Sequence, residues 1–315
     1  MSDDDTSVPH PRETLSFFGH ADAERALLDA YRSGRMHHAW LIGGPHGIGK
    51  ATLAYRFARF ILAHPSPALA KDATSLNVEP DNTTARRIAA RAHPDLLTLE
   101  RTETDSGTLR TVIRVDDVRR TVGFFGSTAG EGGWRICIVD TADELQVPQA
   151  ANALLKIIEE PPPRSLFLLV SNAPGRLLPT IRSRCRRLDL RPLAPADVAC
   201  AAASATGRAA DDPTIAAAGA AAGGSVADVL QLIDGDTLEL VRRINAMLSE
   251  LPRVDPQALH ALGDALAGTD PAPLAIFVHT VNAWLSQRLR TPSAALPRLA
   301  RVAEVWEKIA AAARD

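Results

Sequence analysis

A glycine-rich heptapeptide lies between an apolar run and an amphipathic segment, and this order admits only a narrow class of folds. Residues 44–50 (GPHGIGK) follow the apolar residues 39–42 and precede residues 51–63, whose apolar positions recur every three to four residues. A buried strand, a glycine-rich loop and a helix form a P-loop, whose backbone N–H groups turn toward phosphate oxygens. The candidate phosphate-binding residues are Gly44, Gly47, Gly49 and Lys50.

Apolar runs continue to alternate with helical patterns up to about residue 190. The expected strands are residues 39–42, 96–99, 111–115, 135–139 and 166–170. The expected helices are residues 21–33, 51–63, 83–91 and 149–160, the last stopped by three prolines. Continuous apolar strands between helices predict a parallel sheet covered on both faces, and only helical patterns follow it.

The fold class is therefore an α/β P-loop domain with a parallel sheet, followed by a small helical domain and an all-α domain. We place the P-loop domain at residues 1–190, the small helical domain at 191–236 and the last domain at 237–315. The second boundary rests on Asp234-Gly235-Asp236 as a turn signal.

Composition excludes several classes of protein. The 35 basic and 37 acidic residues give a net charge of -2, which excludes a generally basic nucleic-acid coat. Three widely spaced cysteines exclude a disulfide scaffold and a four-cysteine zinc site. No run of about 18 apolar residues occurs, and the N-terminus, with the acidic residues 3–5, does not begin a signal peptide. We therefore expect a soluble, cytoplasmic protein with no membrane partner.

The residue after Lys50 departs from a working P-loop. A serine or threonine is needed there, because its hydroxyl coordinates Mg²⁺, but the chain has Ala51. Thr52 is one residue further along, about 100° around the helix, so its hydroxyl should not replace the missing one. Thr52 remains a candidate for residual nucleotide contact, and magnesium binding should be weakened.

The strand at 135–139 ends in Asp140, as in a Walker B segment, where the aspartate assists the metal ion. A glutamate that orients water should follow, and the chain has Thr141 instead. Asp143 and Glu144 are expected to cap or solvate the next helix. With Ala51 and Thr141 in one hydrolytic centre, we expect poor hydrolysis and at most weak binding of ATP, ADP or phosphate.

Five segments together resemble a known family. They are residues 37–45 (HHAWLIGGP), 93–96 (HPDL), 113–119 (IRVDDVR), 150–162 (AANALLKIIEEPP) and 183–185 (SRC). In order and spacing, from about residue 15 to 190, the chain resembles the delta-prime subunits of bacterial DNA polymerase III clamp loaders, in the AAA+ superfamily.

The resemblance implies an AAA+ domain, a helical lid and a helical collar that joins five subunits into a ring. It also implies that Arg184 lies at a neighbouring subunit's ATP and acts in trans, a role that suits a permanently charged guanidinium. From composition alone, Arg184 is one of several arginines on a basic face. The implied partners are gamma/tau motor and delta subunits, with the sliding clamp and primed DNA reached through the complex.

Two further departures follow from the same resemblance. Motor subunits carry a lid arginine in a Gly-Ser-x-Arg-Asp stretch, and the similar residues 224–228 have Ala227 at that position. Many relatives carry a cysteine-rich zinc module, but residues 64–92 contain no cysteine, and His64 and His93 alone make no tetrahedral site. We therefore predict no zinc, no other bound metal and no required cofactor.

The leading hypothesis is a non-hydrolysing scaffold subunit that completes a neighbour's ATP site. The alternative is an ATP-hydrolysing motor like gamma/tau, favoured by Lys50 and Asp140 and opposed by Ala51, Thr141 and Ala227. A P-loop helicase or small-molecule kinase is disfavoured by residues 150–162 and 183–185.

Overall fold

The computed structural model describes residues 9–104, 107–126, 133–233, 235–251 and 255–267, together with 273–274, 276–278, 280–281 and 284–285. The acidic residues 3–5, Asp234 and residues 286–315 of the predicted third domain lie outside the described residues. The chain divides into two compact units, Met1–Ala210 with Gly224–Ala227, and Asp211–Gly223 with Asp228–Asp315.

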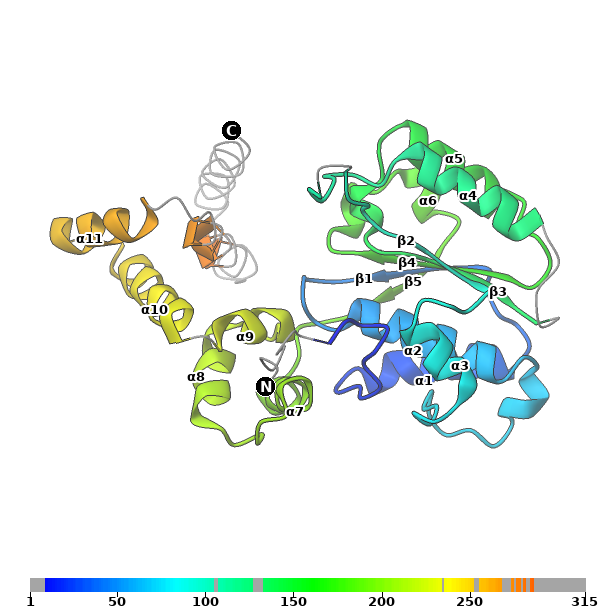
Figure 1. Ribbon diagram of the computed structural model, residues 1–315, viewed down its shortest axis with the longest axis horizontal. Coiled ribbons are helices and arrows are strands. Elements are labelled where there is room, and N and C mark those ends of the chain that lie inside the picture. Colours follow the sequence, from blue (N-terminus) through cyan, green and yellow to red (C-terminus); the bar gives the residue numbers. More distant parts are fainter. Residues whose placement is uncertain are drawn as a thin grey trace. The chain divides into compact units, whose positions relative to one another are not determined.

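One sheet of five parallel strands forms the centre of the first unit, in the order β2-β3-β4-β1-β5 (Figure 1). The strands are β1 (Ala39–Gly43), β2 (Leu96–Leu99), β3 (Arg135–Val139), β4 (Ser165–Ser171) and β5 (Arg186–Asp189). β1 lies between β4 and β5, with Leu41 opposite Leu169 on one side and Arg187 on the other.

Helices cover both faces of this sheet (Figure 1). One face carries α1 (Ala21–Arg32), α2 (Lys50–Ala63) and α3 (Thr83–Ala89), and the other carries α4 (Val115–Gly126), α5 (Gln149–Glu159) and α6 (Pro179–Arg182). Trp40 and Ile42 of β1 enter one core, and Ala39 and Leu41 enter the other. Because both faces are buried, the inner strands are apolar except at Arg135, Ser165 and Ser171 at their ends.

Short helices and a helical C-terminal part complete the described chain. Three single turns are η1 (Pro67–Ala70), η2 (Ala142–Glu144) and η3 (Pro174–Arg176). The later helices are α7 (Pro195–Thr206), α8 (Pro213–Ala221), α9 (Val226–Leu232), α10 (Gly235–Glu250) and α11 (Pro256–Leu266). In the second unit, Ile244 and Leu248 of α10 pack with Leu262 of α11 in one apolar cluster.

The predicted fold class is confirmed, because a parallel sheet covered on both faces is followed by helices. The strand predicted at 111–115 is wrong: Ile113 makes only an isolated bridge to Leu145, and α4 begins at Val115. The carboxylate of Asp117 accepts the N–H of Arg114 at 3.3 Å, which favours a helix start there. The predicted boundaries at 190/191 and 236/237 stay predictions.

The sequence pattern missed β5, the edge strand that carries Arg186 and Arg187. An edge strand has one unpaired side and keeps charged residues, so it lacks the apolar run that identified the inner strands. No helix in the described ranges is long and apolar enough to span a membrane.

Removing the Phe167 side chain should test this double-faced core. Phe167 is fully buried in β4, and its ring centroid lies 4.8 Å from that of Phe125. Phe167→Ala should lower the free energy of unfolding by about 3–5 kcal/mol, measured by urea denaturation. Val122→Ala on the exposed side of α4 should change it by less than about 0.5 kcal/mol. Equal losses in the two variants would contradict the assigned core.

Candidate functional site

The glycine-rich loop lies at the carboxyl end of β1 and is tied to both neighbouring strands. The N–H of Gly44 donates to the carbonyl of Ser171 at 3.2 Å, and the carbonyl of Gly43 accepts the N–H of Leu190 at 2.7 Å. Gly47 and Gly49 have φ of 72° and 93°, a region that side chains disfavour. The loop therefore has the backbone turns that the P-loop prediction requires.

Lys50 begins α2 and is buried, with 4% of its surface exposed. Its ammonium group donates to the carbonyl of Pro45, so the side chain folds back onto the loop. Burial lowers the pKa of Lys50 to about 8, and the carboxylates of Asp140 and Asp143 oppose this shift. The structure thus brings together the predicted lysine and the predicted strand-end aspartate.

Asp140 follows the last residue of β3 and is held by its N–H, which donates to the carbonyl of Leu99 at 2.9 Å. Burial raises the pKa of Asp140 to about 6, and the nearby carboxylates of Glu100 and Glu144 raise it further, against the effect of Lys50. The positive charge of Lys50 therefore favours the ionised form of Asp140.

Groups that would complete a hydrolytic centre are missing or engaged elsewhere. Ala51 and Thr52 are half-buried on α2, and Ala51 has no hydroxyl to offer a metal ion. Thr141 stands where a water-orienting glutamate would be, and the nearby Glu144 forms an ion pair with Arg101 at 2.9 Å. Within the described part of the chain, no three histidine, cysteine, aspartate or glutamate side chains gather as a metal site.

The expectation that Asp143 caps or solvates the next helix is wrong. Its carboxylate accepts hydrogen bonds from the Ser171 hydroxyl at 2.8 Å and from the N–H of Ala173 at 3.2 Å. The single turn η2 places Asp143 against the carboxyl end of β4, where these donors need a partner. Asp143 therefore fixes the loop after β4 next to the glycine-rich loop.

The stretch 224–227 packs directly on the glycine-rich loop. The carbonyl of Gly47 accepts the N–H groups of Val226 at 2.8 Å and Ala227 at 3.3 Å. A Cβ on Gly47 would lie 2.1 Å from the Ser225 hydroxyl oxygen and 2.7 Å from the Ala227 Cβ. The structure thus brings Ala227 to the loop. Its methyl side chain offers no positive charge to a phosphate bound there.

Two residues that sequence reasoning missed also contact the loop. A ring nitrogen of His20 lies 3.0 Å from the carbonyl oxygen of Ile48, and Phe17 lies 3.4 Å from the position of a Cβ on Gly49. The N-terminal segment before them is held by Arg56, which donates to the carbonyl of Leu15 at 2.7 Å. The sequence shows an aromatic pair at 17–18 before a glycine. Its contact with the loop could not be predicted, because it joins segments that are distant along the chain.

Arg184 lies near the amino ends of the strands, away from the loop. It precedes β5, and Arg186 of β5 is opposite Trp40 near the amino end of β1, whereas the loop follows the carboxyl end of β1. Strands rise about 3.3 Å per residue, so the steps of β1 from Trp40, at the level of Arg186, to Gly44 put about 13 Å between that level and the loop. The structure does not bring Arg184 to Lys50, and the guanidinium instead pairs with Glu159 at 2.7 Å.

Two of the neighbouring arginines also have local partners. Arg187 pairs with Asp189 at 2.9 Å, and the Arg186 guanidinium lies 4.8 Å from the centre of the Trp40 ring. The basic face predicted from composition is therefore partly neutralised.

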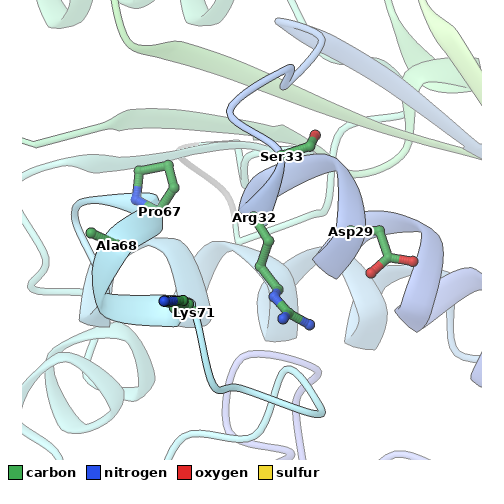
Figure 2. A pocket seen from close by; sticks show the side chains of 6 residues that line it. All are labelled: Asp29, Arg32, Ser33, Pro67, Ala68 and Lys71. Atoms are coloured by element: carbon green, nitrogen blue, oxygen red, sulfur yellow. The ribbon is translucent and has the colours of Figure 1, made fainter.

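A separate pocket of about 480 Å³ lies between α1 and η1 (Figure 2). Its lining residues are Asp29, Arg32, Ser33, Pro67, Ala68 and Lys71. Side chains of both charges line the pocket. None of the lining residues belongs to the predicted site. The pocket is thus distinct from the glycine-rich loop.

Comparison with known proteins gives one family. The family described as "DNA polymerase III, delta subunit" matches residues 19–194, more than half of the chain. The DNA polymerase III subunit delta' of Pseudomonas aeruginosa is 42% identical over 148 residues, which are 47% of this chain and 41% of that protein. The subunit delta' of Escherichia coli is 36% identical over 166 residues, 53% of this chain and 46% of that protein.

A more distant relative matches more of the chain. The DNA polymerase III subunit gamma/tau of Mycobacterium tuberculosis is 29% identical over 281 residues, which are 84% of this chain and 44% of that protein. The matched regions thus span less than half the length of each of these relatives.

A methyl group on Gly47 should disturb the packing of residues 224–227. Gly47→Ala should lower the free energy of unfolding by about 1–3 kcal/mol more than Gly34→Ala, because only the former overpacks a contact. Gly34 is a matched control, with φ of 69° and nothing within 4 Å of its Cβ position. Urea denaturation of both variants measures the difference. Equal losses would show that residues 224–227 do not pack on the loop.

Proposed function

Because the chain belongs to the bacterial DNA polymerase III delta-prime family of AAA+ P-loop proteins, we propose that it is a non-hydrolysing clamp-loader subunit. In this role it completes a neighbouring subunit's ATP site with Arg184 and helps to load the sliding clamp onto primed DNA. The observation that carries the proposal is the place of Arg184, half-exposed near the amino ends of the strands, whereas the chain's own loop follows the carboxyl end of β1.

The position of Arg184 supports action in trans. Arg184 precedes β5, whose Arg186 lies at a level about 13 Å from the loop along the strand direction, so its guanidinium is remote from a nucleotide in the chain's own loop. A guanidinium is always charged and offers several N–H groups to phosphate oxygens, so it stabilises charge as the γ-phosphate leaves. The backbone on both sides is anchored by the buried Ile181 and Cys185.

The chain's own loop supports a role without hydrolysis. Ala51 offers no metal-binding hydroxyl, Thr141 replaces the water-orienting glutamate, and Ala227 offers no charge to a phosphate. Lys50 is turned onto the carbonyl of Pro45. With the loop backbone and Lys50 retained, we propose at most weak ATP, ADP or phosphate binding, no bound metal and no zinc.

The proposed partners are gamma/tau motor subunits and a delta subunit in a five-subunit ring in the cytoplasm. Contact with the sliding clamp and primed DNA occurs through this complex. Phosphate contacts carry little sequence information, so any DNA contact would position the complex rather than select a sequence. The carboxylate of Asp189 offsets the positive charge that Arg187 offers to DNA, whereas Arg186 keeps its charge over the Trp40 ring.

An ATP-hydrolysing motor is the second candidate. The coupling of Lys50 with Asp140 and the gamma/tau relative that matches 84% of the chain favour it. The three departures at Ala51, Thr141 and Ala227 oppose it, because each removes a group from the same reaction centre. We therefore prefer the scaffold role.

Substitution of Arg184 tests the proposal. In an assembly reconstituted with the organism's own partner subunits, Arg184→Ala should reduce ATP turnover stimulated by clamp and primed DNA. The loss should be on the order of 10³ or more in the one site that the arginine serves. Total turnover falls less, because other sites continue.

Arg187→Ala is the control, since this exposed arginine pairs with its own Asp189. Its turnover should match the wild type. Unchanged turnover in Arg184→Ala, with the assembly intact by size-exclusion chromatography, would exclude the trans role.

A further inference from the structure

We infer that Glu159 is the positioning residue for Arg184, holding its guanidinium at the subunit surface for a neighbour's nucleotide. This inference rests on the proposed function, because it assigns Glu159 a part in the action of Arg184 in trans. It concerns the charged pair itself, in which the Arg184 guanidinium and the Glu159 carboxylate approach to 2.7 Å.

The backbone around Arg184 is fixed, but the side chain needs a partner of its own. The N–H of Arg184 donates to the carbonyl of Ile181 at 3.1 Å, and the Ser183 hydroxyl donates to the carbonyl of Thr180 at 3.1 Å. Ile181 and Cys185 are 1% and 8% exposed, so the turn is anchored in the core on both sides. The Arg184 side chain is 39% exposed and extends from this fixed turn.

Two contacts from different elements orient the guanidinium. One terminal nitrogen lies 2.7 Å from a carboxylate oxygen of Glu159 on α5, and the other donates to the carbonyl of Thr180 on α6 at 3.1 Å. A guanidinium has five N–H groups, so three remain for another acceptor. Three donors are enough for a two-pronged contact with phosphate oxygens.

Glu159 is itself on a rigid support. It is the last residue of α5, whose Ala151, Leu154 and Ile158 are buried in the core. The adjacent Glu160 is also exposed but forms no ion pair with any residue that the structure describes. Of these two neighbouring carboxylates, only Glu159 is placed to direct Arg184.

An exposed ion pair of this kind adds little to folding stability, so its effect is expected in orientation. A free arginine side chain loses considerable rotamer freedom when it is fixed. A guanidinium that is already oriented in the free subunit loses less of that freedom when the neighbouring nucleotide arrives. A carboxylate that merely competed with phosphate for Arg184 would slow turnover. Removing Glu159 should therefore lower turnover if it positions Arg184 and raise turnover if it competes.

The test uses the reconstituted assembly with its clamp and primed DNA. At the one site that Arg184 serves, Glu159→Ala should lower kcat for ATP turnover about three- to tenfold, with KM for ATP unchanged, and total turnover should fall by less than in Arg184→Ala. Glu159→Gln should retain most of the activity, because its amide oxygen still accepts a hydrogen bond. Glu160→Ala is the matched control and should behave as the wild type. Glu159→Ala combined with Arg184→Ala should be no slower than Arg184→Ala alone.

The outcomes separate this inference from the proposed function. If Arg184→Ala slows turnover while Glu159→Ala equals or exceeds the wild type, the positioning role is overturned and the trans role of Arg184 stands. If Arg184→Ala has no effect in an intact assembly, the proposed function fails and the inference fails with it. A kcat loss in Glu159→Ala that Glu159→Gln restores supports the positioning role.

Discussion

The backbone pairing of β1 with β4 on one side and β5 on the other places the glycine-rich loop and Arg184 relative to each other. At the carboxyl end of β1, hydrogen bonds from Gly44 to Ser171 and from Leu190 to Gly43 hold the glycine-rich loop against both neighbours. At the amino end, the parallel register of Arg186 with Trp40 sets the level of Arg184. One ladder thus separates a phosphate-type loop from an exposed arginine by the length of a strand.

The glycine-rich loop keeps its backbone turns, although Ala51, Thr141 and Ala227 lack the groups that hydrolysis requires. A buried lysine is costly unless opposite charges lie near it, and Asp140 and Asp143 supply them for Lys50. Asp143 also holds the end of β4, and the carbonyl of Gly47 accepts two N–H groups from residues 226–227. These contacts give the loop a structural role, so a P-loop backbone can persist without the groups that hydrolysis requires.

The inner strands and their helices were predictable from the sequence, because burial on both faces leaves apolar residues at successive positions in the middle of each strand. The prediction of a strand at 111–115 was wrong because a run with branched side chains has the same pattern whether or not a partner strand exists. The sequence analysis missed β5 because this edge strand keeps charged residues. Most residues of the loop were predictable from a local motif.

The parts of the site that escaped prediction depend on long-range contacts. Phe17 and His20 reach the loop from the segment before α1, and Asp143 turns toward β4 instead of the helix that follows it. Glu159 meets Arg184 only because α5 and α6 end on the same side of the core. No local pattern encodes these approaches, since each joins residues that are distant along the chain.

The most direct test of the account is an electron cryo-microscopy structure of the assembled complex with a non-hydrolysable ATP analogue. The account predicts the Arg184 guanidinium within hydrogen-bond distance of the γ-phosphate held by a neighbouring subunit, with no magnesium ion beside Lys50 and Ala51. A magnesium–nucleotide complex seated in this chain's own loop, with Arg184 turned away from any nucleotide, would contradict it.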